Sequence, residues 1–239
     1  MATELIVALD YPKAEQALEL VQAVRSQKLD VIWKVGSELF MASGPEFVRK
    51  LTQGGGRVFL DLKFHDIPNT VTKAAAQACE LGVAMFTLHI AGGSDMVEAV
   101  MKEVQKAAKP PIVLGVTVLT SFDESGWKKT AEAVSGQRPQ GLISDSVSRL
   151  AAAGAHWGLT GIVCSAHEIG RVQKAAPDLY TVVPGIRPAG SNAQDQARIL
   201  TPAEAAQQGA SAIVVGRPIT QAAKPVEAIA SILKELASA

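Results

Sequence analysis

The chain has 239 residues, 48% of them hydrophobic, and its 23 basic side chains are balanced by 23 acidic ones. This length is close to the roughly 250 residues of a typical (β/α)8 barrel, and a neutral chain lacks an overall field that would attract nucleic acid or anionic lipid. The sequence starts without a signal-peptide pattern and contains no run of about 18 apolar residues. We therefore expect one soluble, cytoplasmic domain over residues 1–239, with neither nucleic acid nor membrane as a partner.

Short runs rich in Val, Ile and Leu alternate with longer Ala-rich stretches, as in repeated βαβ units. The expected strands begin at Glu4, Val31, Arg57, Ala84, Ile112, Gly161, Tyr180 and Ala212. Helices are expected over residues 13–26, 46–53, 69–81, 95–108, 141–153, 168–175 and 225–236. Eight parallel strands predict a closed barrel, so the expected fold is α/β, a single (β/α)8 or TIM barrel.

Residues 120–140 are the least regular part of the sequence, because Ser, Gly, Lys and Pro accumulate there between the fifth and sixth strands. This segment is longer than an ordinary connection in such a barrel. We expect an irregular loop that acts as a lid.

Metal and disulfide chemistry has little support in the sequence. Cys79 and Cys164 lie far apart, and the four histidines have no ligand spacing with cysteine or carboxylate residues. We expect free thiols and no metal site.

Barrels of this class place their functional groups where the strands end, at the C-terminal mouth. Polar residues do follow or end most of the predicted strands: Asp10, Lys34, Asp61, Lys63, Thr117, Thr120, Ser165, Arg187, Gly216 and Arg217. Charged groups from separate strands should therefore converge on one mouth.

The most informative motif is DLKFHDIPNT, which runs from Asp61 to Thr70. Residues two apart on a strand face the same side, so Asp61 and Lys63 should both point into the barrel, with α-carbons roughly 6.6 Å apart. Asp66 follows just after the strand and should add a second carboxylate near Lys63. An alternative is an ordinary surface ion-pair network on the loop, which a lysine inside the mouth makes the weaker interpretation.

Lys34 lies within the apolar run VIWKV, where an unpaired ammonium would cost several kcal/mol of desolvation. Asp61 is its natural partner, and the predicted order of charges is Lys34, Asp61, Lys63 and then Asp66. A lysine that reaches solvent from a sheet edge is the alternative, but a closed barrel has no edge.

A second site is expected after strands seven and eight, where many barrels bind phosphate. Gly216 lets the backbone approach an anion, Arg217 can bind phosphate in bidentate fashion, and the preceding loop adds Arg187 and Gln196. Taken alone, a Gly-Arg-Pro sequence is more often an ordinary turn. Ser165 has no His and Asp arranged to activate it, and His65 and His89 have no assigned role.

These motifs together resemble the orotidine 5'-monophosphate decarboxylase family. The elements that carry the resemblance are IVALD, WKVG, DLKFHDIPNTV, VTVLTS, PGIRPAGSNAQDQAR and VGRPIT, which span almost the whole chain. The resemblance implies decarboxylation of orotidine 5'-phosphate to UMP without a cofactor. It further implies that Lys63 is the proton donor, held in a network with Lys34, Asp61 and Asp66.

By the same resemblance, Asp66 and Thr70 reach into the site of a neighbouring subunit, so a homodimer is implied. Asp10 and Lys34 would hold ribose hydroxyls, and Thr120 would contact the pyrimidine. The residues implied for the phosphate side are Arg187, Gln196, Gly216 and Arg217. Two alternatives stay open: a Mg²⁺-dependent sugar phosphate decarboxylase or aldolase of the same superfamily, and a non-catalytic barrel that binds sugar phosphates.

Overall fold

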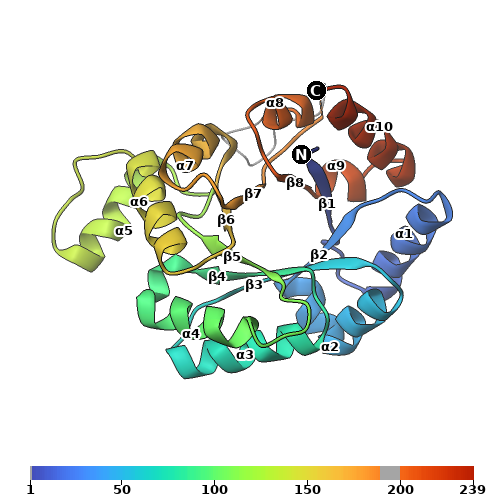
Figure 1. The fold of residues 1–239 in the computed structure, drawn as a ribbon. Helices are drawn as coiled ribbons and strands as arrows, with labels where there is room; N and C mark the ends of the chain where they lie inside the picture. The colour runs from blue at the N-terminus through green and yellow to red at the C-terminus, as the bar shows by residue number, and fades with distance from the viewer. Residues whose placement is uncertain (1, 189–199) are drawn as a thin grey trace.

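The computed structural model describes residues 2–188 and 200–239, and within them eight parallel strands form a closed barrel surrounded by helices (Figure 1). The strands are β1 (Glu4–Ala8), β2 (Ile32–Gly36), β3 (Arg57–Phe64), β4 (Met85–His89), β5 (Ile112–Val116), β6 (Gly161–Val163), β7 (Tyr180–Val183) and β8 (Ala212–Val215). β8 pairs in parallel with β1 and so closes the ring. The predicted (β/α)8 fold is confirmed.

Helices follow the strands around the outside of the barrel. They are α1 (Ala14–Ser26), α2 (Ser37–Gln53), α3 (Pro68–Glu80), α4 (Ser94–Val104), α5 (Glu124–Ser135), α6 (Ile143–His156), α7 (Ile169–Ala175), α8 (Pro202–Gln207), α9 (Arg217–Thr220) and α10 (Pro225–Ala237), with short 3-10 turns η1 (Ile90–Gly92) and η2 (Ala166–Glu168). Among the described helices, none combines the length and the apolar character needed to cross a bilayer.

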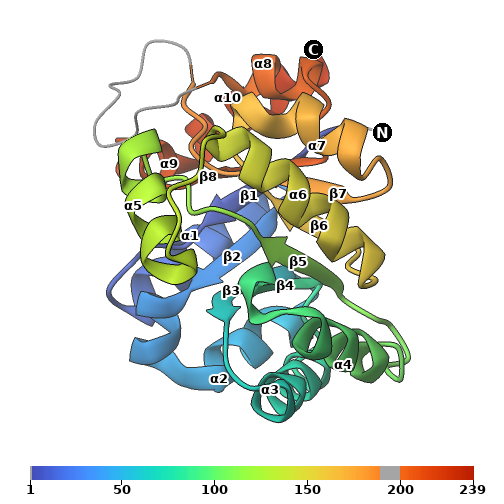
Figure 2. The same ribbon diagram turned by 90° about the vertical axis from the view of Figure 1, so that its left-hand side faces the viewer.

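Two parts of the helical prediction are wrong. α2 begins at Ser37 rather than at residue 46, because Gly44, with a φ of 67°, joins two helical pieces across a kink. Residues 120–140 are not an irregular loop, because α5 occupies their middle and Asp123 caps it by accepting a hydrogen bond from the Gly126 N–H at 2.6 Å. α5 lies beside α6 (Figure 2), where Trp127 Nε1 donates to Ser146 Oγ at 3.0 Å.

Side chains inside the barrel form layers. The layer nearer the N-terminal opening is apolar, and its side chains are at most 2% exposed. It consists of Ile6, Ile32, Phe59, Met85, Leu114, Val182 and Ala212. Residues two positions further along each strand face the same side and form the next layer toward the C-terminal mouth. On three adjacent strands this next layer is polar, with Lys34 on β2, Asp61 on β3 and Thr87 on β4.

A separate polar network closes the N-terminal opening of the barrel. Glu4 accepts hydrogen bonds from Arg57 and Tyr180, and Arg57 also contacts Asp30 at 2.9 Å. Partial burial alone would raise the pKa of Glu4, but the hydrogen bonds from Tyr180 and Arg57 outweigh it and hold that pKa below its ordinary value of 4.5. Glu4, Asp30 and Arg57 are thus paired with one another at this end of the barrel.

Candidate active site

The C-terminal mouth holds a chain of alternating charges. Lys34 Nζ lies 3.1 Å from Asp10 Oδ1 and 3.7 Å from Asp61 Oδ2. Lys63 Nζ lies 2.8 Å from Asp61 Oδ1. The predicted alternation of Lys34, Asp61 and Lys63 is therefore present, and Asp10 extends it at the Lys34 end.

The centre of this chain is buried and its ends reach solvent. The side chains of Lys34 and Asp61 are 12% and 13% exposed, whereas those of Asp10 and Lys63 are 48% and 39% exposed. A buried charge is stable only when it is paired and hydrogen-bonded, and each of the two central groups has two partners of opposite charge. The Lys63 ammonium is consequently held from below while its outer side stays open to an incoming molecule.

The backbone at Lys63 departs from a regular strand. Its φ is 50°, a left-handed value that is uncommon for a residue with a side chain. The pairing register between β3 and β4 shifts between Leu60 and Phe64. Inside this irregular stretch the Lys63 N–H donates to Thr87 Oγ1 at 2.9 Å, and the Thr87 hydroxyl lies 3.1 Å from Asp61 Oδ1. The Asp61 and Lys63 side chains do meet on one side, as predicted, but within an irregular stretch of β3 rather than through simple alternation.

In the part of the chain that the structure describes, Asp66 does not join the charge chain. Its Oδ1 accepts a hydrogen bond from the Ile67 N–H at 2.6 Å, and within residues 2–188 and 200–239 it forms no ion pair. β3 ends at Phe64, and both Asp66 and Thr70 are exposed. Within a single chain, Asp66 thus forms no ion pair with Lys63 among the described residues, and its predicted place beside Lys63 stays a prediction.

A cavity of about 150 Å³ opens directly above the apolar layer. Its polar wall consists of Lys34, Asp61, Lys63 and Thr120. The remaining wall is apolar and comes from Phe59, Val116, Val118, Leu119, Val163, Val182, Pro184 and Val214. A ligand in this cavity would meet two ammonium groups, a carboxylate and a hydroxyl on one side and hydrocarbon on the others.

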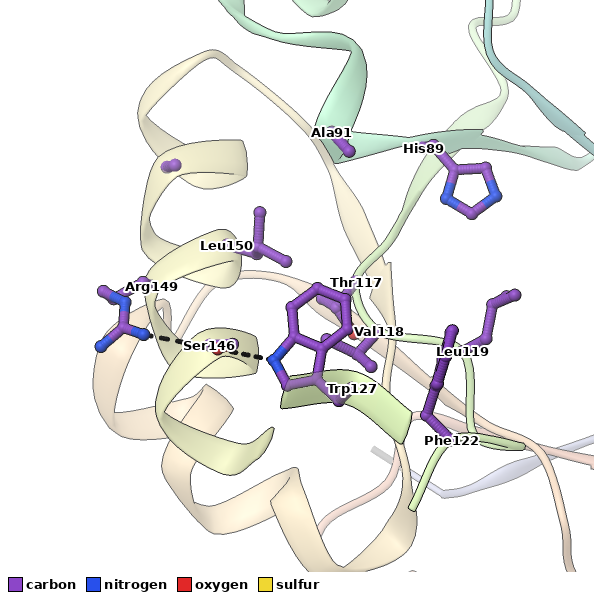
Figure 3. A pocket seen from close by; sticks show the side chains of 11 residues that line it. His89, Ala91, Thr117, Val118, Leu119, Phe122, Trp127, Ser146, Arg149 and Leu150 are labelled. Atoms are coloured by element: carbon purple, nitrogen blue, oxygen red, sulfur yellow. Dashed lines mark hydrogen bonds between the residues drawn. The ribbon is translucent and has the colours of Figure 1, made fainter. Parts of the chain in front are cut away.

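A second, wider pocket of about 500 Å³ adjoins the cavity, since Val118 and Leu119 line both (Figure 3). In the figure His89 and Trp127 lie on different sides of this pocket. The His89 ring lies 5.3 Å from that of His65, between ring centroids. Burial lowers the pKa of His89, and His65 and Lys63 lower it further, so the neutral imidazole is favoured.

Three of the residues predicted for phosphate, Arg187, Gly216 and Arg217, lie at the same mouth but outside the 150 Å³ cavity. Arg187 follows β7, is 6% exposed and donates to the Ile186 carbonyl at 3.2 Å. Gly216 and Arg217 form the start of α9. A Cβ atom added at Gly216 would lie 3.2 Å from Asp10 Oδ2, so the backbone there packs closely against that carboxylate. Gln196 lies outside the described residues.

In the part of the chain that the structure describes, no group of three or more His, Cys, Asp or Glu side chains is placed so that it could hold a metal ion. Cys79 and Cys164 are free thiols. Burial raises the pKa of both, which favours the neutral thiol.

Sequence reasoning did not identify Thr87, which stands in the apolar run MFTLH. The one sign of Thr87 in the sequence is that it is a polar residue within an apolar run. Its role can be recognised only when the pairing of β3 with β4 places it next to Asp61.

Comparisons with known proteins agree on one family. The family described as Orotidine 5'-phosphate decarboxylase / HUMPS matches residues 3–232. An orotidine 5'-phosphate decarboxylase from Sodalis glossinidius is 46% identical over 234 residues, with 97% of this chain and 89% of that protein covered. The one from Pseudomonas fluorescens is 44% identical over 236 residues, with 98% of both covered. The crystal structure of the Lactobacillus acidophilus orotidine 5'-phosphate decarboxylase gives a TM-score of 0.81 at 37% identity, and 98% of this chain and 99% of that chain are covered.

Proposed function

The chain belongs to the Orotidine 5'-phosphate decarboxylase / HUMPS family, and from this premise we propose that it decarboxylates orotidine 5'-phosphate to UMP. The observation that carries the proposal is the half-exposed Lys63 ammonium, which lies 2.8 Å from the buried Asp61 carboxylate and lines a cavity whose other walls are apolar. The reaction would serve de novo pyrimidine nucleotide synthesis in the cytoplasm, with residues 1–239 as one catalytic domain and no cofactor.

The chemistry requires a positive charge at a fixed place. When the bond from C6 of the pyrimidine to its carboxylate breaks, CO2 leaves and the electron pair stays on C6 in the plane of the ring, where no π-system can accept it. A preorganised cation stabilises that charge most effectively in a site from which water is excluded. Lys63 is that cation, and it then donates a proton to C6.

Asp61 and Lys34 support this role of Lys63. Asp61 orients the ammonium through the contact at 2.8 Å, and Lys34 adds a second positive charge 3.7 Å from the same carboxylate. Asp61 would also face the departing carboxylate, and repulsion between the two would raise the energy of the bound substrate. We rank stabilisation by Lys63 above this repulsion.

The size of the cavity suggests how the nucleotide binds. At about 150 Å³ it is smaller than the roughly 300–1,000 Å³ pockets that enclose drug-sized ligands. The pyrimidine ring would enter it beside Thr120, and the ribose would lie across the mouth near Asp10 and Lys34. The phosphate would then reach Arg187, Gln196, Gly216 and Arg217, where remote binding energy contributes to the rate.

We also propose a homodimer in which Asp66 and Thr70 complete the partner's site. Both residues are exposed, Ile67 between them is 66% exposed, and Asp66 has no lysine partner in its own chain among the described residues. Mixing the inactive Lys63→Ala and Asp66→Ala variants should restore activity, since a mixed dimer contains one site with both residues intact. A mixture that stays inactive although the chains exchange would contradict a shared site.

A spectrophotometric assay with orotidine 5'-phosphate tests the activity itself. The wild-type protein should consume it in the presence of a chelator, whereas a Mg²⁺-dependent sugar phosphate enzyme would not. Lys63→Ala should abolish turnover and still bind UMP. Substantial turnover by Lys63→Ala would contradict the assignment of Lys63 as cation and proton donor. A wild-type protein that binds the nucleotide without converting it would be a non-catalytic barrel.

A further inference from the structure

We propose that Thr87 is a positioning residue for Lys63, a role that rests on the proposed decarboxylation. The hydroxyl of Thr87 contacts the backbone of Lys63 and the carboxylate that holds the ammonium of the same residue. Thr87 thereby fixes Lys63 at both of its ends, from the neighbouring strand.

The hydrogen bonds form a closed loop through three residues. The Lys63 N–H donates to Thr87 Oγ1 at 2.9 Å, and Thr87 Oγ1 donates to Asp61 Oδ1 at 3.1 Å. Asp61 Oδ1 in turn accepts from Lys63 Nζ at 2.8 Å. Since a carboxylate only accepts and a backbone N–H only donates, the single hydroxyl proton has one possible direction in this loop.

The conformation of Lys63 makes this support necessary. With a φ of 50° the residue is in a region that costs energy for any side chain and persists only where the surroundings enforce it. The shifted register between Leu60 and Phe64 lets the N–H of Lys63 meet a side chain of β4. Thr87 is 1% exposed, so its hydroxyl acts from inside the protein and not from the surface.

Removing the hydroxyl should therefore shift the ammonium without emptying the substrate site. Thr87→Val keeps the shape of the side chain, but it leaves the Lys63 N–H and Asp61 Oδ1 each without one partner. A misplacement of about 1 Å in a reacting group costs about 100-fold in rate. We expect kcat of Thr87→Val to fall by about that factor, whereas the affinity for UMP stays at the wild-type value.

The experiment compares Thr87→Val, Thr87→Ser and Thr87→Ala with the wild-type protein in kcat, KM and UMP affinity, after thermal unfolding confirms that each is folded. Thr87→Ser retains the hydroxyl and should retain kcat. Thr87→Ala provides the same comparison should Thr87→Val not fold. Thr181→Val is the matched control, because Thr181 is 2% exposed on β7 and its hydroxyl contacts the Leu179 carbonyl, outside the site. This control should lose stability but not kcat.

A double variant distinguishes positioning from general packing. If Thr87 acts through Asp61 and Lys63, then Thr87→Val combined with Asp61→Asn should lose little more activity than Asp61→Asn alone. Fully additive losses, or equal kcat values for the Ser, Ala and Val variants, would overturn the inference. A wild-type protein without decarboxylase activity would instead overturn the proposed function, so the two failures are distinguishable.

Discussion

Replacing Asp61 with Asn tests the charge chain at its centre. Removing one partner of a buried ion pair costs about 3–5 kcal/mol. The low end applies here, because Lys34 keeps Asp10 at 3.1 Å and Lys63, 39% exposed, can turn toward water. With about 3 kcal/mol lost, and about 2–4 °C of Tm for each kcal/mol in a chain of 239 residues, Tm should fall by about 6–12 °C.

Calorimetry and urea unfolding measure this loss directly. Asp178→Asn is the control, because Asp178 is exposed and forms no ion pair in the part of the chain that the structure describes. Lys34→Met combined with Asp61→Asn removes both buried charges, and it should be more stable than Asp61→Asn alone. A Tm for Asp61→Asn within about 2 °C of the wild-type value would refute the reasoning, since it would mean that the Lys34 ammonium needs no carboxylate from β3.

Three further predictions concern other parts of the barrel. Arg217→Ala should lower kcat/KM for orotidine 5'-phosphate by several orders of magnitude. An unchanged kcat/KM would contradict the proposal that the start of α9 binds the phosphate. Asp123→Ala removes the cap of α5 and should cost about 1 kcal/mol in urea unfolding; no change would show that the cap contributes nothing. Because the pKa of Glu4 is lowered by folding, its ionised form contributes stability above pH 4.5, and this is lost as the pH falls through the folded-state pKa. Glu4→Gln should therefore be less stable than wild type near pH 7, and this difference in stability should shrink as the pH falls below 4.5; a difference that does not shrink in acid would contradict this assignment.

The sequence was sufficient to predict the barrel because its strands are buried on both faces and therefore appear as continuous apolar runs. Against such runs, Lys34, Asp61 and Lys63 are conspicuous, and their spacing places them at one end of the barrel. Helix α5 escaped prediction for the opposite reason: none of its residues is buried, and its sequence ESGWKKTAEAVS contains few large apolar side chains. Only its cap at Asp123 marks its start. α8 likewise begins with a capping box at Thr201 and Glu204 that the periodicity does not reveal.

The missing details of the site depend on contacts between distant segments. The left-handed conformation of Lys63 cannot be inferred from a lysine, because it results from the irregular pairing of β3 with β4 and from the hydroxyl of Thr87. The position of Asp66 depends on where the chain turns after Phe64, a geometry that local spacing does not determine.

The apolar layer inside the barrel allows the two ends of the barrel to evolve separately. Ile6, Phe59 and their neighbours separate the Glu4 network at one opening from the Lys34 and Asp61 pair at the other. Hydrocarbon side chains transfer no protons and form no hydrogen bonds, so the two networks are not coupled through this layer. Substitutions in the Glu4 network can therefore adapt the stability of the protein to heat or acidity and leave the Lys34 and Asp61 pair unchanged.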